Sequence, residues 1–154
     1  TGRVLDAVAA LLGICYERTY EGEPAMKLES ASIKGKEVLH LQPKIEGKTL
    51  RTAHLLRGVF DGLGKYRAED LAYSAQNYLA TGLGQLAIEK ARELDIDVIG
   101  FSGGVAYNEF ITTRIRALVE EAKLKFLTNV QVPPGDGGIS FGQVFATGML
   151  LEEK

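Results

Sequence analysis

The sequence predicts an α/β protein folded as a three-layer sandwich, in which helices cover a central sheet. Two observations support this class. Apolar residues recur at helical spacing through much of the chain, and from residue 96 onward the order is strand, helix, strand, helix. A length of 154 residues suits a single domain, 1–154, with a sizeable core.

Two helices are expected before residue 32. Gly13 suits the C-terminal end of the first helix, where glycine is favoured. Pro24 suits the first turn of a second helix over 23–31, because its missing N–H has no helical partner there. The first helix is indicated by apolar residues at helical spacing: Leu5, Val8, Leu11 and Leu12.

A hairpin and a third helix are expected next. Segments 38–42 and 49–51 are expected to pair as strands, with Glu46-Gly47 at the turn. The helix covers 52–62, with Thr52 as its N-cap. Its expected apolar stripe is Ala53, Leu56, Val59 and Phe60.

One long helix is predicted over 68–94. Gly82 and Gly84 each cost about 1 kcal/mol inside such a helix, but they could allow close packing of a neighbouring helix. The following segment, 96–101, is a continuous apolar run of the kind that sheets bury on both faces. The long helix is indicated by Leu71, Ala75, Tyr78, Leu79, Leu86 and Leu94.

The C-terminal third completes the alternation of helices and strands. A short strand is expected over 125–127, and a closing helix over 139–151 with Val144, Phe145 and Met149 facing inward. The helix between the two strands is indicated by Ile111, Ile115, Leu118, Val119 and Ala122.

Composition excludes several functional classes. A net charge of −2 gives no electrostatic case for a nucleic-acid partner. No apolar run reaches 18 residues, so we expect no membrane span. Cys15 is the single cysteine, which excludes an internal disulfide framework and is compatible with the cytoplasm. Because the sequence enters a helix directly at Thr1, we expect it to be a fragment of a longer chain.

Two glycine-rich turns hold the candidate site. Each lies between a predicted strand and a predicted helix, so its backbone N–H groups can approach a phosphate where no Cβ intervenes. In the first turn, Gly103 and Gly104 free the backbone, and the carboxamide of Asn108 can bind a base or a ribose. The alternative is a plain strand–helix connection with Asn108 on the surface.

The second turn adds a carboxylate. Asp136 precedes Gly137-Gly138 and the closing helix. It is either a metal ligand directed into the cleft or an ordinary helix N-cap, a position that Asp favours. Together the two turns predict a nucleotide-dependent enzyme.

These motifs resemble the hydrogenase maturation carbamoyltransferase family HypF. The resemblance rests on both turns and on the N-terminal run, so it covers nearly the whole chain. It implies the second lobe of an actin-like, sugar-kinase-like (ribonuclease H-like) fold. Related families are the tRNA threonylcarbamoyl transferases and the antibiotic O-carbamoyltransferases. The matching runs are 2–13, 20–26, 102–108 and 136–143.

The resemblance also implies roles for individual residues. Asp6, four residues after a glycine, would contact the nucleotide ribose. Glu21 or Glu23 would lie beside the same ribose. Asp136 would ligate a zinc or iron ion. The first turn would contact the nucleotide through Gly103, Gly104 and Asn108.

Three departures from the family pattern bear on these roles. Gly135 stands where relatives usually have Asn, and Glu109 stands where they usually have Arg. The two metal-binding histidines of an HxxxH motif in the preceding lobe have no counterpart in this sequence. Either the sequence is truncated, or it is a non-catalytic module.

The implied reaction moves a carbamoyl group from an ATP-derived carbamoyl-adenylate to the C-terminal cysteine of HypE. The product leads to the cyanide ligand of nickel–iron hydrogenase. The implied partners are HypE and the remaining domains of the same parent protein, and the isolated chain is expected to be inactive. The alternatives are another carbamoyl or threonylcarbamoyl transferase, or a lobe that binds a nucleotide or partner without turnover.

Overall fold

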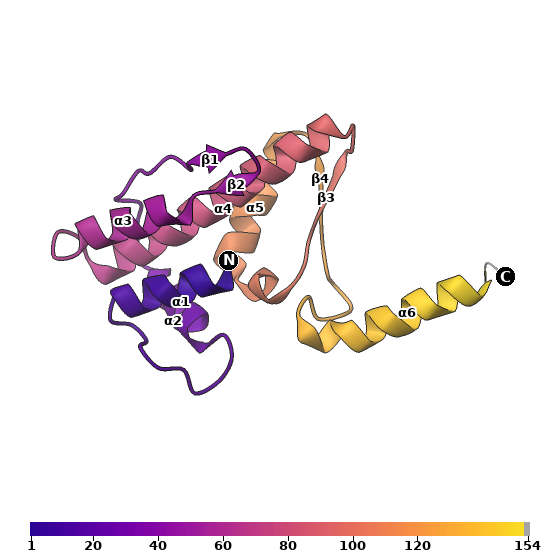
Figure 1. The fold of residues 1–154 in the computed structure, drawn as a ribbon, viewed down its shortest axis with the longest axis horizontal. Coiled ribbons are helices and arrows are strands. Elements are labelled where there is room, and N and C mark those ends of the chain that lie inside the picture. The colour runs from indigo at the N-terminus through magenta and orange to yellow at the C-terminus, as the bar shows by residue number, and fades with distance from the viewer. Residues whose placement is uncertain (153–154) are drawn as a thin grey trace.

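The computed structural model describes residues 1–152 as a helical body with a short sheet on one side and a projecting C-terminal helix (Figure 1). Helix α4 is the long central element, and the other body helices pack on it or on one another. The body helices are α1 (Gly2–Leu11), α2 (Glu23–Ser32), α3 (Thr52–Gly62), α4 (Ala68–Glu93) and α5 (Glu109–Glu121).

Two small sheets complete the described fold. Strands β1 (Ile45–Glu46) and β2 (Thr49–Leu50) form an antiparallel hairpin. Strands β3 (Val98–Phe101) and β4 (Lys125–Thr128) pair in parallel, with α5 as the crossover between them. The predicted α/β class is therefore confirmed.

Short 3-10 turns follow both parallel strands. The first, η1 (Gly104–Tyr107), separates β3 from α5. The second, η2 (Asp136–Gly138), leads into the C-terminal helix α6 (Ile139–Glu152). Both glycine-rich turns therefore lie at the carboxyl end of the parallel strands, where α/β folds commonly bind ligands.

The core lies where α1, α2, α3 and α5 meet α4. Fully buried leucines and valines come from each of these helices, and Tyr78 of α4 is the largest fully buried side chain. Representative members are Leu5, Leu28, Leu55, Leu79, Ile111 and Val119. Burying a side chain of this size contributes about 1.5–3 kcal/mol.

The glycines of α4 serve close packing, as the sequence predicted. A Cβ on Gly82 would come within 2.6 Å of Leu50, and one on Gly84 within 3.0 Å of Leu118. The single long helix and the helix-ending role of Gly13, whose φ is +70°, are also confirmed.

The prediction of a strand at 38–42 was wrong. The amides of Val38 and His40 donate to the side chains of Ser74 and Glu37, at 2.9 Å each, instead of to a neighbouring strand. The short hairpin forms downstream, and its turn begins at Gly47, whose φ is +58°.

The expected burial of α3 and β3 and the expected N-cap of α3 were also wrong. In α3, Ala53 and Phe60 are exposed, whereas Leu55 is buried with Val59. The N-cap of α3 is Arg51 and not Thr52. Strand β3 alternates between exposed and half-buried residues because, in the part of the chain described, only one face of this sheet is covered by the body helices.

Helix α6 does not face inward. Val144, Phe145 and Met149 are 74%, 61% and 50% exposed, and the helix projects away from the body (Figure 1). Over residues 1–152, none of the helices combines the length and apolarity that a membrane crossing requires.

Candidate nucleotide-binding cleft

The two glycine-rich turns contact each other. The Gly103 amide donates to the carbonyl of Pro134 at 2.7 Å, and the Ser102 hydroxyl donates to the same oxygen at 3.1 Å. The ring of Tyr107 lies so close to Gly135 that a Cβ there would come within 2.6 Å of it. Two turns that are well separated in the sequence therefore form one wall.

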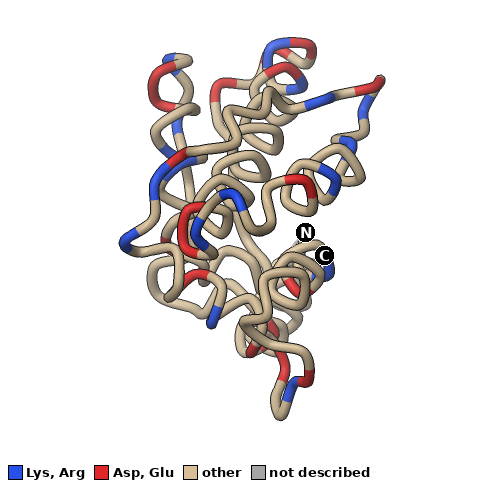
Figure 2. The backbone as a smooth tube through the Cα atoms, turned by 90° about the vertical axis from the view of Figure 1, so that its left-hand side faces the viewer, with Lys and Arg blue, Asp and Glu red and all other residues tan. Residues whose placement is uncertain are grey.

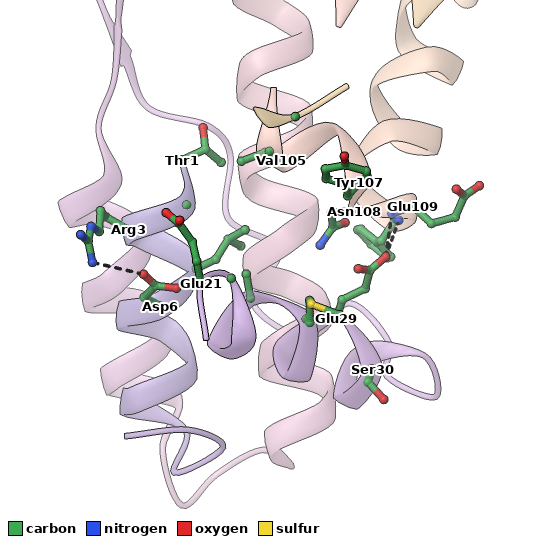
Figure 3. A pocket seen from close by; sticks show the side chains of 18 of the residues that line it. Thr1, Arg3, Asp6, Glu21, Glu29, Ser30, Val105, Tyr107, Asn108 and Glu109 are labelled. Atoms are coloured by element: carbon green, nitrogen blue, oxygen red, sulfur yellow. Dashed lines mark hydrogen bonds and ion pairs between the residues drawn. The ribbon is translucent and has the colours of Figure 1, made fainter. Parts of the chain in front are cut away.

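That wall closes one side of an open cleft of about 1310 Å³. Helices α1 and α2 form the opposite side, and the N-terminus of α5 lies between them (Figure 3). The cleft exceeds a typical closed small-molecule pocket and could accommodate a nucleotide. Five of the residues singled out from the sequence line it: Asp6, Glu21, Gly104, Asn108 and Asp136.

Glu23 lies outside the cleft lining and serves a local structural role. Its carboxylate accepts hydrogen bonds from the Thr19 amide and hydroxyl, at 2.5 and 3.0 Å. The Lys27 ammonium lies 2.7 Å away and, with the Thr19 amide, lowers the pKa of Glu23 from 4.5 to about 2. Of the two candidate glutamates, Glu21 is therefore the one placed at the cleft.

Gly103 also lies outside the lining, but its backbone explains the choice of glycine. Its φ of +99° and ψ of 176° place it in a region that residues with a Cβ rarely adopt. In this conformation its amide reaches Pro134 and joins the two turns. Its neighbour Gly104 begins η1 and lines the cleft.

Asn108 is the N-cap of α5. Its Oδ1 accepts the Ile111 amide at 2.8 Å, and its Nδ2 donates to Gln76 at 2.8 Å. The sequence offered a plain strand–helix connection with Asn108 on the surface as the alternative. That surface position was wrong, because Asn108 follows η1 directly and is only 6% exposed.

The N-terminus of α5 already binds an acidic group. Glu29 of α2 accepts the amides of Glu109 and Phe110, at 2.6 and 3.3 Å (Figure 3). A carboxylate is favourable at this end of a helix because it meets free N–H groups and the positive end of the helix dipole. Glu29 therefore occupies the first two amides of α5, whereas the expectation concerned the amides of the glycine-rich turns.

Charges of both signs border the cleft. Arg3 lies 3.7 Å from the Asp6 carboxylate, which remains about a quarter exposed. Arg18 and Glu21 line the same opening. Basic and acidic residues are interspersed along the chain in the view of Figure 2, so a ligand would be recognised by individual groups and not by a broad field.

Asp136 is exposed at the edge of the cleft. The cap of η2 is Gly135, without a side-chain capping bond. Within residues 1–152, no three His, Cys, Asp or Glu side chains lie close enough together to hold a metal ion. The described residues alone therefore do not fit a metal ion, although Asp136 could contribute one oxygen ligand.

Three residues at or beneath the cleft were missed from the sequence. Glu29 and Arg3 gave no signal, because charged residues on helices usually face solvent. Gln76 did give one: it is a polar residue within the otherwise apolar face of α4 that includes Ala72, Ala75 and Leu79. A buried amide in such a setting requires polar partners.

Comparison with known proteins identifies the family. Residues 1–143 match the family described as carbamoyltransferase, Kae1-like domain, second subdomain. The chain belongs to this family. It is 43% identical over 144 residues to the probable carbamoyltransferase HypF of Methanocaldococcus jannaschii, covering 93% of this chain and 19% of that protein. It therefore spans about a fifth of the length of this relative.

Solved structures agree with the sequence match. The crystal structure of T. kodakarensis HypF superposes with a TM-score of 0.90 at 45% identity, over 99% of this chain and 20% of that one. Full-length HypF in a phosphate- and nucleotide-bound form gives a TM-score of 0.88 at 28% identity, with the same coverage. The tRNA N6-adenosine threonylcarbamoyltransferase of Thermococcus kodakarensis is 29% identical over 137 residues, 88% of this chain and 39% of that protein.

Proposed function

We propose that this chain is the nucleotide-binding lobe of a longer carbamoyltransferase. The enzyme would move a carbamoyl group from carbamoyl-adenylate to the C-terminal cysteine of HypE, in the synthesis of the hydrogenase cyanide ligand. The observation that carries the proposal is the cleft between the two glycine-rich turns and helices α1 and α2, which is lined by residues from four separate segments of the chain. Its support is the similarity to HypF proteins along almost the whole sequence.

The cleft offers suitable groups for an adenylate. The carboxylates of Asp6 and Glu21 can accept hydrogen bonds from ribose hydroxyls, since an ionised carboxylate is a strong acceptor. The apolar side chains of Ala25, Met26 and Ile33 also line the cleft and can contact the base. Asn108 retains one N–H and one oxygen lone pair for a ligand.

The proposed reaction is an acyl transfer to sulfur. The acceptor thiolate attacks the carbamoyl carbon, a C–S bond forms, and the C–O bond to the adenylate phosphate breaks. AMP leaves with the bonding electron pair. The residues of this lobe hold the leaving nucleotide in place, which lowers the entropic part of the barrier.

The exposed surface of α6 supports a place within a larger protein. Apolar side chains surround this helix, and a helix that is apolar on all sides is normally buried. In the HypF relatives, about four fifths of the sequence lies outside the part that matches this chain. We infer that the remaining domains of the parent protein cover α6 and complete the cleft, so the isolated chain would not catalyse transfer.

Asp136 is proposed as one ligand of a zinc or iron ion whose other ligands lie elsewhere in the parent protein. The test is Asp136→Asn in the full-length protein, supplied with ATP, a carbamoyl donor and HypE. Intact-mass spectrometry reports carbamoylated HypE, and elemental analysis reports bound metal. We expect transfer to fall to background and metal to be lost, because the amide lacks the charge that the cation requires.

The control is Asp97→Asn, an exposed aspartate at the opposite end of β3 from the glycine turn. It should leave both transfer and metal content unchanged. Normal transfer and normal metal in Asp136→Asn would remove the assignment.

A tRNA threonylcarbamoyl transfer is the second candidate, favoured by the 29% identity to that enzyme. Incubation with tRNA in place of HypE distinguishes the two. Modified tRNA with unmodified HypE would select the second candidate.

A further inference from the structure

Three buried polar side chains form a continuous chain of hydrogen bonds at the cleft, whose lining includes Ser32 and Asn108 but not Gln76. Asn108 Nδ2 donates to Gln76 Oε1 at 2.8 Å, and Gln76 Nε2 donates to Ser32 Oγ at 2.7 Å. The Ser32 hydroxyl donates to the Glu29 carbonyl at 2.7 Å. Helices α5, α4 and α2 are thereby connected through side chains that are 6%, 0% and 2% exposed. We call Ser32, Gln76 and Asn108 the amide relay.

The bond from the Ser32 hydroxyl to the Glu29 carbonyl decides which group donates and which accepts in every other hydrogen bond of the amide relay. A hydroxyl has one hydrogen to donate, and Ser32 gives it to the Glu29 carbonyl, so its oxygen can only accept from Gln76. Gln76 must then present its NH2 group to Ser32 and its carbonyl to Asn108. Asn108 in turn presents its NH2 group to Gln76, which leaves Oδ1 for the Ile111 amide.

This arrangement decides which groups Asn108 shows to the cleft. Asn108 lines the cleft, whereas Gln76 lies behind it and is not part of the lining. The bond to Ile111 restrains only the oxygen end of the carboxamide, and the bond to Gln76 restrains the nitrogen end. Without Gln76, a buried N–H would lack its partner, and the carboxamide would turn to recover one.

We propose that Gln76 is a positioning residue of the cleft, which orients the Asn108 carboxamide for a nucleotide and acts only through it. The inference rests on the proposed nucleotide-binding function. A positioning role for Gln76 differs from a purely structural role in one measurable respect. A residue that acts through Asn108 should have no effect on affinity once the Asn108 carboxamide has been removed.

The test is a double-mutant cycle on AMP affinity, measured by titration calorimetry on the full-length protein. Gln76→Met keeps the side-chain length and removes the side-chain hydrogen bonds to Asn108, Ser32 and the Ala72 carbonyl. We expect AMP to bind about 10-fold more weakly to this variant, the size expected for the loss of one hydrogen bond between the Asn108 carboxamide and the nucleotide. Asn108→Ala should also weaken binding. The double variant should bind no more weakly than Asn108→Ala alone.

The matched control is Asn77→Leu on the same helix. Asn77 also loses a side-chain hydrogen bond, the 2.7 Å bond to Glu37, but it lies outside the cleft lining. We expect a lower melting temperature and unchanged AMP affinity. If Gln76→Met does not fold, Ser32→Ala replaces it in the cycle, with an expected loss of about threefold. Because Ser32 also lines the cleft, only the absence of additivity with Asn108→Ala supports the positioning role, and additive losses overturn it.

Unchanged AMP affinity in Gln76→Met, or losses that simply add in the double variant, would overturn the positioning role. Absence of AMP binding to the wild-type protein is a different result. It would overturn the nucleotide site itself, and the positioning role with it.

Discussion

The helical body and helix α6 are both rich in apolar residues, but those residues are buried in the body and exposed in α6. In the body, Leu28 and Leu79 are almost completely buried between helices. In α6, Leu150 and Leu151 are 65% and 67% exposed. The body therefore carries its own stabilising contacts, whereas the apolar side chains of α6 lie largely exposed in the described part of the chain.

The largest expected effect comes from making the same leucine-to-alanine substitution at a buried site in the body and at an exposed site in α6. Leu28→Ala should destabilise the isolated chain by about 2–5 kcal/mol, because it leaves a cavity in the core. Leu150→Ala should change its stability by no more than about 0.5 kcal/mol, because the side chain is already in water. Chemical denaturation of both variants measures the difference.

The same two substitutions in the full-length protein test whether α6 is covered there. There Leu150→Ala should cost about 2 kcal/mol or more, since we expect α6 to be covered. A cost of less than about 0.5 kcal/mol in the full-length protein would argue against α6 as a contact surface.

A smaller effect concerns the cleft, which draws residues from the body and from the segment leading to α6. We expect the isolated chain to bind AMP with a dissociation constant nearer millimolar than micromolar, or about −4 kcal/mol. The reason is that, in the proposed parent protein, the other domains would complete the cleft. Titration calorimetry measures this value, and micromolar binding would show that the lobe forms a complete site by itself.

The smallest expected effect lies within the body and appears only in acid. Folding lowers the pKa of Glu23 to about 2, so the ionised carboxylate stabilises the fold at neutral pH. That contribution is complete above about pH 4.5 and is lost as the pH falls toward about 2. Glu23→Gln should therefore lower the melting temperature at pH 7.

Thermal unfolding across this pH range measures the contribution of Glu23. The difference between wild type and Glu23→Gln should shrink between pH 4.5 and 2. The matched control is Glu21→Gln, the same change at an exposed side chain, which should leave the melting temperature at pH 7 nearly unchanged. A difference that persists at pH 2 would mean that the charge of Glu23 is not its source.

The sequence predicted those parts of the fold that follow from local periodicity. Helix α4 was predicted as one element despite Gly82 and Gly84, and the parallel strands on either side of α5 were placed correctly. Failure at 38–42 depended in part on a distant partner. This segment resembles a strand, but the hydroxyl of Ser74 on α4 accepts the Val38 amide, and the nearby Glu37 carboxylate accepts the His40 amide. No local pattern reveals that competition.

The candidate site shows the same division. Glycines and the short motifs around Asn108 and Asp136 indicated where the two turns lie, and both reach the cleft. The choice between Glu21 and Glu23 could not be made from spacing, because it depends on Lys27 and Thr19 holding Glu23 in a local network. Nor could the sequence reveal that Glu29 lies at α5, eighty residues further along the chain.

The position of Glu29 has a consequence for how a ligand can be oriented. Its carboxylate occupies the amides at the start of α5, which in many nucleotide-binding folds receive a phosphate. A phosphate brought to this point would meet a negative charge. The uncharged nucleoside end of a nucleotide therefore fits better beside α5, and its phosphates would point outward along the glycine-rich turns, toward whatever surface closes the cleft.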